Sequence, residues 1–279
     1  MSDRYAVLGN PVAHSRSPDI HAAFARQTGQ DIEYGRVLCP LDGFEAKVRE
    51  FVAGGGRGCN VTVPFKFEAP RLAARCSDRA RLAGAANTLR FDDAGWFADN
   101  TDGIGLVRDI EQHAGLPLAG KRVLLVGAGG AGAGVLGPLL TARPAEVVVA
   151  NRTVDRARTL ADRHADWARE HEVRLTATGL GQPGEAFDVV LNASASSLHG
   201  QPAPVPACTL ARGALAVDLM YGAAAQPFLV WAGAAGATVR DGLGMLVEQA
   251  AEAFFLWRGV RPLTAPVLRA LRDSLADSA

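Results

Sequence analysis

Twenty consecutive residues from Val123 to Ala142 carry no charged side chain. That length would suit a transmembrane helix, but the run contains six glycines and Pro138. A parallel strand that is covered on both faces is a continuous apolar run. The segment therefore predicts a buried strand, a glycine turn and a helix within an α/β domain.

Apolar runs alternate with helical stretches through the middle of the chain. The expected strands are 122–126, 146–150, 173–178, 187–193, 215–219 and 237–240. This alternation is typical of a Rossmann-type, doubly wound parallel sheet. The first hundred residues have an alternation of their own, which starts with a strand at Tyr5–Leu8 and a helix at about Pro18–Thr28 that Gly29 closes.

An apolar stripe at helical spacing follows the last expected strand. Its members are Leu243, Leu246, Val247, Ala250, Ala251, Phe254 and Phe255. We expect this helix to leave the middle domain and pack on the N-terminal one. The predicted fold class is α/β with two domains and a cleft between them, where small ligands usually bind. Residues 1–101, completed by the C-terminal helices 243–279, form one domain, and residues 102–242 form the Rossmann domain.

Composition argues against several classes of partner. Lysine plus arginine equals aspartate plus glutamate at 29 each, so no global basic field attracts nucleic acid or a membrane surface. The four cysteines form neither a disulfide framework nor a metal-ligand spacing, and the six histidines do not cluster. The N-terminal apolar run is too short for a signal peptide. We expect a cytoplasmic monomer or homodimer that binds a small molecule and no metal.

The glycine turn has the G-x-G-x-x-G spacing at Gly127, Gly129 and Gly132. The bare pattern is weak evidence in a chain with 31 glycines, and a glycine-rich packing turn would also produce it. Its context is more informative, because it follows an expected strand and opens an expected helix. Amides at such a helix start can bind a pyrophosphate, so the turn predicts a dinucleotide site.

The end of the second expected strand indicates which dinucleotide binds. An acidic residue there would bind the ribose hydroxyl of NAD, but residues 151–153 read Asn-Arg-Thr. Arg152 and Arg156 can make charge-assisted contacts with a 2′-phosphate. An arginine-rich, solvated helix start is the alternative, and it accounts for Arg158 better than for Arg152. We expect residues 102–242 to bind NADP(H).

Two serines precede the first expected helix, whose first residue is Pro18. One interpretation makes Ser17 the N-cap of that helix. The other adds a small anion, since a carboxylate at the helix start would find the hydroxyls of Ser15 and Ser17 and the positive end of the dipole. The spacing alone does not decide between them.

Lys66 follows a strand in which period-two alternation places Asn60 and Thr62 on one face. Pro64 ends the strand, so we expect Lys66 at the start of the next helix. A lysine held there is suited to act as a general acid or base. An exposed lysine with no such role is the alternative.

A hairpin is expected where 87–91 and 96–100 flank the turn 92–95. With that turn, Asn87 lies near Asn100 and emerges at the same end of the hairpin as Asp102. A carboxylate and a carboxamide together suit the hydroxyls of a polyol. Turn aspartates are also common for purely local reasons.

Several long motifs in this order resemble the shikimate dehydrogenase family. The motifs are YAVLGNPVAHSRSPDIH, GCNVTVPFK, LAGAANTL, DNTDGIGL, VGAGGA, NRTVDRA and DGLGMLVEQAAEAFFLW. The resemblance covers essentially the whole chain. It implies an NADP-dependent oxidoreductase of the shikimate/quinate dehydrogenase superfamily, which reduces 3-dehydroshikimate to shikimate on the route to chorismate and the aromatic amino acids.

The resemblance also implies roles for individual residues. Lys66 and Asp102 would be the catalytic pair. The substrate would contact Ser15, Ser17, Thr62, Asn87, Asp102, Tyr221 and Gln249. The cofactor would contact Gly127, Ala128, Gly129, Gly130, Ala131, Asn151, Arg152, Thr153, Arg156, Leu219, Gly242 and Asp78.

The chain departs from the family pattern at three places. Gly132 stands where members often have serine, residues 194–197 read Ser-Ala-Ser-Ser where they often have Thr-Ser-Ser-Gly, and Leu219 stands where some have methionine. A quinate or aminoshikimate dehydrogenase of the same superfamily is a close alternative. A non-catalytic NADP(H)-binding regulator is an alternative from another class.

Overall fold

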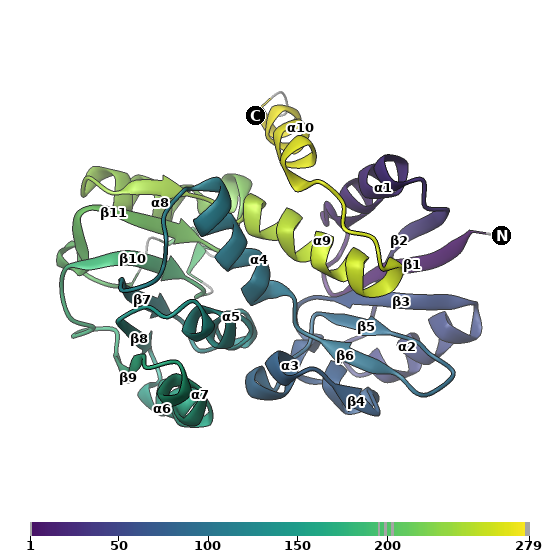
Figure 1. The fold of residues 1–279 in the computed structure, drawn as a ribbon, viewed down its shortest axis with the longest axis horizontal. Helices are drawn as coiled ribbons and strands as arrows, with labels where there is room; N and C mark the ends of the chain where they lie inside the picture. Colours follow the sequence, from purple (N-terminus) through teal and green to yellow (C-terminus); the bar gives the residue numbers. More distant parts are fainter. Residues whose placement is uncertain (1, 195, 198–199, 202–203, 277–279) are drawn as a thin grey trace. The chain divides into compact units, whose positions relative to one another are not determined.

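The computed structural model describes residues 2–194, 196–197, 200–201 and 204–276 (Figure 1). Ala195 in the 194–197 departure, His199 among the histidines, and residues 1 and 277–279 of the expected domains lie outside that description. The chain divides into two compact units. Met1–Gly105 together with Leu246–Ala279 forms the first unit, and Leu106–Met245 forms the second.

The first unit has a mixed sheet in the order β2-β1-β3-β5-β6-β4. Its strands are β1 Asp3–Gly9, β2 Ile32–Leu38, β3 Gly56–Val61, β4 Arg75–Cys76, β5 Thr88–Arg90 and β6 Phe97–Asp99. Its helices are α1 Ser17–Thr28, α2 Phe44–Ala53, α3 Asp78–Ala83, α10 Thr264–Ala276 and most of α9 Leu243–Arg258. Strand β1 pairs in parallel with β2 and β3, whereas β5 is antiparallel to β3 and β6.

The second unit has a sheet in the order β12-β11-β10-β7-β8-β9 with parallel pairing throughout. Its strands are β7 Arg122–Val126, β8 Glu146–Asn151, β9 Arg174–Gly179, β10 Phe187–Asn192, β11 Leu210–Asp218 and β12 Thr238–Arg240. Its helices are α5 Gly130–Thr141, α6 Val154–Arg163, α7 Ala165–Glu170, α8 Gln226–Ala234 and the last three residues of α4 Asp102–Arg108. The predicted doubly wound sheet is confirmed.

The strand order of the second unit reverses between β7 and β10. The chain runs outward from β7 through β8 to β9, then returns beside β7 as β10 and continues through β11 to β12. In open α/β sheets, ligands bind beyond the carboxyl ends of the strands at such a switch point. The glycine turn directly follows β7 and therefore begins at this position.

Helix α1 ends as predicted, at Gly29, whose φ of 66° is left-handed. The prediction that Ser17 caps this helix is wrong by one residue. Arg16 occupies the N-cap position without a capping side-chain bond, and Ser17 is the first helical residue. The Ser15 hydroxyl accepts the Ser17 N–H at 3.3 Å, so a neighbouring side chain satisfies this amide.

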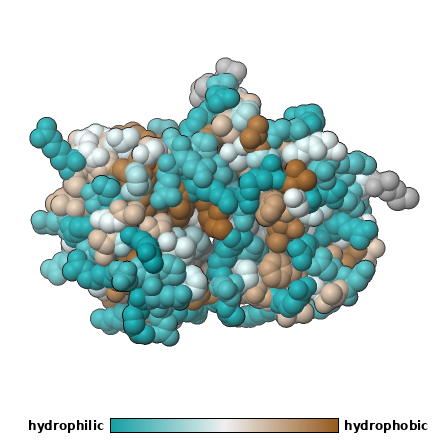
Figure 2. All heavy atoms as spheres, viewed as in Figure 1, coloured by the Kyte–Doolittle hydropathy of each residue, from teal (hydrophilic) through white to brown (hydrophobic). Residues whose placement is uncertain are grey.

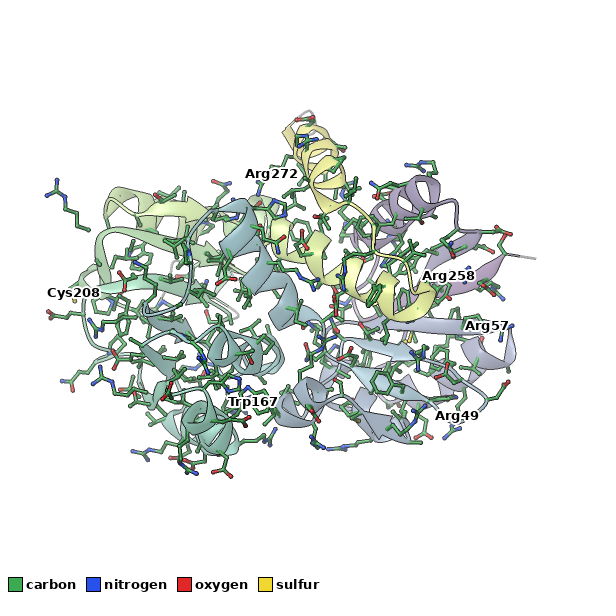
Figure 3. All side chains as sticks on the ribbon, in the orientation of Figure 1. Arg49, Arg57, Trp167, Cys208, Arg258 and Arg272 are labelled. Atoms are coloured by element: carbon green, nitrogen blue, oxygen red, sulfur yellow. The ribbon has the colours of Figure 1, made fainter. Side chains whose placement is uncertain are left out.

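Helix α9 packs on the sheet of the first unit, as its apolar stripe predicts (Figure 1). The Trp257 ring stacks on Tyr5 with centroids 4.7 Å apart, and its Nε1 donates to the Leu89 carbonyl at 3.0 Å. Arg258, labelled in Figure 3, forms an ion pair with Asp3 of β1. Segments far apart in the sequence therefore share one core. Among the described residues, no helix is long and apolar enough to cross a membrane.

Gly58 of β3 makes room for the indole of α9. A Cβ there would lie 2.6 Å from Trp257 Nε1 and 2.8 Å from the Leu89 carbonyl oxygen. We expect Gly58→Ala to lower the free energy of unfolding by about 1–3 kcal/mol, because the strand and the indole must separate. Urea titration of both proteins measures this difference.

Gly35→Ala in strand β2 of the same sheet is the matched control. A Cβ at Gly35 would meet no heavy atom within 4 Å. Its stability should equal or slightly exceed that of the wild type, since alanine has the smaller entropy loss on folding. Equal stability of the two variants would contradict the packing role of Gly58.

Candidate active site

Lys66 and Asp102 form an ion pair with 2.6 Å between Nζ and Oδ2. The two side chains are only 17% and 6% exposed. Lys66 lies in the three-residue 3₁₀ turn Phe65–Phe67, so the expected helix start is wrong. A second 3₁₀ turn, with Pro70 in its first positions, follows directly. Because proline has no N–H to donate, the chain does not extend the first turn into a longer helix there.

Both oxygens of the Asp102 carboxylate accept hydrogen bonds. Oδ2 accepts from Lys66, and Oδ1 accepts from Asn87 Nδ2 at 2.8 Å. The backbone also positions the lysine, since its carbonyl accepts the Ala86 N–H at 2.8 Å. A carboxylate that only accepts hydrogen bonds is ionised, so the site presents an ammonium group beside a fixed negative charge.

The predicted hairpin is confirmed and explains how Asn87 reaches Asp102. Strands β5 and β6 pair with Thr88 opposite Asp99, which places Asn87 opposite Asn100 at one end of the hairpin. Asp102 follows at that end as the first residue of α4. The turn therefore holds a carboxamide against a carboxylate, as the spacing predicts.

Two more side chains enclose the Asn87 amide. Its Nδ2 lies 2.9 Å from Thr101 Oγ1 and 3.0 Å from Gln249 Oε1. Gln249 belongs to α9, so only the return of that helix brings it to the hairpin. Thr101 is missing from the predicted site residues. Its position between Asn100 and Asp102 is the signal that could have indicated it.

The predicted serine pair is also close in space. The Ser15 and Ser17 hydroxyls are 3.2 Å apart, and Ser17 is buried. Arg36 of β2 donates to the Ser15 carbonyl from Nε and Nη2 at 3.1 and 2.7 Å. The sequence did not indicate this arginine, which adds positive charge beside the serines. Thr62 lies just beyond β3, where its N–H bonds to the Leu8 carbonyl at 2.9 Å.

The glycine turn of the second unit satisfies the requirements of a dinucleotide loop. Gly127 has φ 112°, and a Cβ there would lie 2.8 Å from the Ala193 carbonyl carbon. A Cβ at Gly132 would lie 2.1 Å from the Gly127 oxygen, whereas one at Gly129 would meet nothing within 4 Å. These environments match a tight turn, close helix–strand packing and an open approach for a pyrophosphate. Helix α5 begins at Gly130 without a side-chain cap, as an anion site requires.

The residues after β8 continue the loop. Asn151 Oδ1 accepts the Ala128 N–H at 3.2 Å, and its Nδ2 donates to the Thr153 carbonyl at 2.9 Å. This side chain therefore joins the ends of β7 and β8. Arg152 and Thr153 follow on the surface.

The arginines around α6 differ in their contacts. Arg158 pairs with Asp155 at 3.2 Å. Arg152 and Arg156 are exposed and have no ion pair within the described ranges of the chain. The surface over α6 and α7 is mostly hydrophilic on the face drawn in Figure 2. Two guanidinium groups thus remain available to an anionic ligand.

A buried polar network at the ends of β10 and β11 was not predicted. Asp218 is fully buried and accepts bonds from Asn192 Nδ2 at 2.8 Å, Ser197 Oγ at 2.5 Å and Met220 N at 2.8 Å. Burial raises the pKa of its carboxyl, and the bonds from Ser197, Met220 and Asn192 oppose that shift. The sequence signal that could have indicated this network is that Asn192 and Asp218, both polar, end two adjacent parallel strands.

Leu219 and Gly242 belong to the same region of the second unit. The Leu219 N–H bonds to the Asn192 carbonyl at 3.0 Å, and a Cβ at Gly242 would lie 2.3 Å from the Leu219 oxygen. Tyr221 lies two residues after Leu219 and is half-buried. Asp78 lies in the first unit at the start of α3, where it is exposed and pairs with Arg81. The roles expected for these four residues stay predictions.

Models of shikimate dehydrogenase domains match three stretches of the chain. The substrate binding domain matches residues 7–89, the shikimate/quinate 5-dehydrogenase model matches 109–200, and the C-terminal domain matches 242–272. The shikimate dehydrogenase (NADP(+)) of Acidovorax sp. (strain JS42) is 62% identical over 278 residues, which cover 100% of this chain and 99% of the relative. The chain belongs to the shikimate dehydrogenase family.

Solved structures of related proteins share the fold over nearly the full length. An Ael1 enzyme from Pseudomonas putida has a TM-score of 0.88 at 49% identity and covers 97% of this chain and 98% of its own. The shikimate 5-dehydrogenase of Thermus thermophilus, solved with NADP(H) and shikimate, has a TM-score of 0.82 at 33% identity, with 97% and 99% covered. The resemblance to the shikimate dehydrogenase family is therefore confirmed.

A methyl group on Gly127 should disrupt the loop. The substitution Gly127→Ala forces an L side chain into φ 112° and against the Ala193 backbone. We expect the Kd for NADPH to rise at least about tenfold, a difference of about 1.4 kcal/mol. Fluorescence titration with NADPH measures it. Gly181→Ala, on an exposed and open turn of the same unit, should bind as the wild type does. Equal affinity of all three proteins would refute the loop assignment.

Proposed function

We propose that the protein catalyses the reversible, NADP(H)-dependent reduction of 3-dehydroshikimate to shikimate. The observation that carries the proposal is the shielded Lys66–Asp102 pair, which Asn87 holds in place. Family membership at 62% identity over the whole chain supports the same reaction. As a shikimate dehydrogenase, the protein would serve chorismate and aromatic amino acid biosynthesis.

Lys66 is the residue proposed to act on the reacting oxygen. When NADPH is bound, it supplies a hydride to the ring ketone carbon. The Lys66 ammonium then donates a proton to the oxygen, or stabilises the negative charge that develops on it. Asp102 accepts from Lys66 and from Asn87 through separate oxygens, so it orients the ammonium before the substrate arrives. Preorganisation of this kind lowers the barrier of the chemical step.

The substrate residues are proposed by their hydrogen-bonding chemistry. The Ser15 and Ser17 hydroxyls, 3.2 Å apart near the start of α1, suit the substrate carboxylate. Arg36 adds a positive charge behind them. The ring hydroxyls would contact Thr62, Asn87, Asp102, Tyr221 and Gln249.

The residues proposed to bind NADP(H) belong to the second unit, except Asp78, which belongs to the first. Gly127 to Ala131 would hold the pyrophosphate at the start of α5. Asn151, Arg152, Thr153 and Arg156 would surround the 2′-phosphate, and Leu219 and Gly242 would lie near the nicotinamide. We accordingly propose that 102–242 is the NADP-binding domain. Residues 1–101, completed by 243–279, would then bind the substrate.

The cysteines fit a reducing compartment, and we propose that the protein is cytoplasmic. Cys39, Cys59, Cys76 and Cys208 are all free thiols, and Cys208 is exposed on the second unit (Figure 3). Burial raises the pKa of Cys39 to about 11, so this thiol remains protonated and unreactive at neutral pH. A monomer or homodimer is expected.

One assay distinguishes two alternative functions from the proposed one. A quinate or aminoshikimate dehydrogenase would differ by a ring substituent, and a regulator would bind NADP(H) without turnover. The assay combines shikimate or quinate with NADP⁺ or NAD⁺ and follows the near-ultraviolet absorbance of the reduced cofactor. Each of the three functions gives a different result. Rapid reduction of NADP⁺ by shikimate alone supports the proposal. Preference for quinate, or cofactor binding without turnover, would replace it with the corresponding alternative.

Removal of the Lys66 amine should affect the chemical step. We expect Lys66→Ala to lower kcat between about a hundredfold and ten-thousandfold, with little change in KM for shikimate. Lys47→Ala is the control, since Lys47 is bound to Glu50 on the surface of α2. A large rise in KM at normal kcat would make Lys66 a binding residue instead.

The arginines after β8 should determine cofactor preference. We expect Arg152→Ala to raise KM for NADP⁺ about tenfold, because a charge-assisted bond to the 2′-phosphate is lost. The low activity with NAD⁺ should not change, since NAD⁺ lacks that phosphate. Arg158→Ala, which removes only the arginine paired with Asp155, should resemble the wild type. Identical NADP⁺ kinetics in both variants would exclude Arg152 from the phosphate site.

A further inference from the structure

A hydrogen-bonded chain begins at Tyr34 of β2, outside the residues assigned to the reaction. Its phenolic hydroxyl donates to Asn60 Oδ1 at 2.7 Å. Asn60 is buried, and its Nδ2 in turn donates to Thr88 Oγ1 at 3.1 Å and to the Asn87 carbonyl at 3.2 Å. The contacts therefore cross from β2 to β5.

The same chain continues to the catalytic pair. The Thr88 hydroxyl donates to Asn87 Oδ1 at 3.0 Å, and Asn87 Nδ2 donates to Asp102 Oδ1 at 2.8 Å. The other oxygen of Asp102 accepts from Lys66. Every donor from Tyr34 onward points toward Asp102, so each group fixes the orientation of the next one.

Sheet register explains how a β2 residue reaches β3. Strand β1 lies between them, with Tyr5 opposite both Tyr34 and Gly58. Asn60 is two residues beyond Gly58 and so lies on the same face of the sheet. The Tyr34 side chain passes over β1 on this face to meet the Asn60 amide.

His21 of α1 holds the Tyr34 ring in place. The two rings stack with centroids 4.2 Å apart and planes 7° apart. His21 is fully buried, and burial lowers its pKa to about 3, although Asn60 acts in the opposite direction. The imidazole is therefore neutral at physiological pH and acts as a flat packing surface for the phenol.

The Tyr34 phenol is a hydrogen-bond donor at neutral pH. Burial raises its pKa well above 10. The hydroxyl is therefore protonated, and its proton lies in the bond to Asn60 that leads to Asp102.

We propose that Tyr34 is a positioning residue, which sets the geometry of the catalytic pair through Asn60. This inference rests on the proposed function. Without the phenolic proton, Asn60 Oδ1 loses its donor. The amide is then free to rotate away from Thr88, and Asn87 loses one of the contacts that orient it against Asp102, while those with Thr101 and Gln249 remain.

Tyr34→Phe tests the proposal, because it removes the hydroxyl and keeps the ring on His21. We expect kcat to fall about tenfold, with KM for NADP⁺ unchanged. Tyr5→Phe is the matched control. The Tyr5 phenol lies on the same face of the sheet, but it contacts Arg258 rather than Asn60. The kinetics of Tyr5→Phe should therefore equal those of the wild type.

A second variant tests transmission along the chain. Thr88→Val interrupts it between Asn60 and Asn87, so kcat should fall while KM for NADP⁺ stays near the wild-type value. In the double variant Tyr34→Phe/Thr88→Val, kcat should be no lower than in the worse single variant, because one pathway is broken twice. Multiplicative losses in kcat would overturn the proposal.

The thermal midpoint distinguishes positioning from simple stability. Unchanged kcat and KM in Tyr34→Phe, with or without a lower midpoint, would assign the hydroxyl a purely structural role and overturn the inference alone. A wild-type protein that does not oxidise shikimate with NADP⁺ would overturn the proposed function, and this inference with it. Activity in the wild type and in Tyr5→Phe, with the expected loss in Tyr34→Phe, supports both.

Discussion

The ion pair between Lys66 and Asp102 depends on hydrogen bonds from several elements of the first unit. Two largely buried charges lose hydration, and that loss is offset only if their remaining hydrogen-bonding positions are filled. Asn87 fills the second oxygen of Asp102, so the hairpin of β5 and β6 must end at this position. Gln249 Oε1 accepts a hydrogen bond from the same Asn87 Nδ2, and Gln249 reaches this position because α9 packs on the same sheet. The hairpin and α9 thus both supply contacts that hold the ion pair in place.

Close backbone approach has the corresponding role in the second unit. Gly127 lies against the Ala193 backbone, and Gly132 lies against Gly127, so the ends of β7 and β10 and the start of α5 pack without side chains between them. The Asn192–Asp218 contact joins β10 to β11 at the same edge. A Cβ at Gly129 would meet nothing within 4 Å, so the start of α5 has room for an anionic ligand.

Elements with strong local patterns were predictable from the sequence. The strand Arg122–Val126 has its expected bounds, and the turn at 92–95 places Asn87 opposite Asn100 as expected. Predictions from local patterns were wrong where a group outside the pattern determines the local structure. Ser17 is not an N-cap, because Ser15 already accepts its amide. Lys66 does not begin a helix, because its 3₁₀ turn gives way at once to a second turn that contains Pro70.

The sequence by itself determined the α/β class and the glycine loop, because each depends on residue types at short, fixed spacing. Lys66 and Asp102 are 36 residues apart, and only the family resemblance suggested them as a pair. Only the tertiary structure decided which side chains surround that pair. Thr101, Asn60 and Tyr34 join it through contacts between strands that no periodicity records. Gln249 enters from a helix more than a hundred residues away. The physical reason is that a hydrogen bond depends on position and angle in space, and sheet order and register set both.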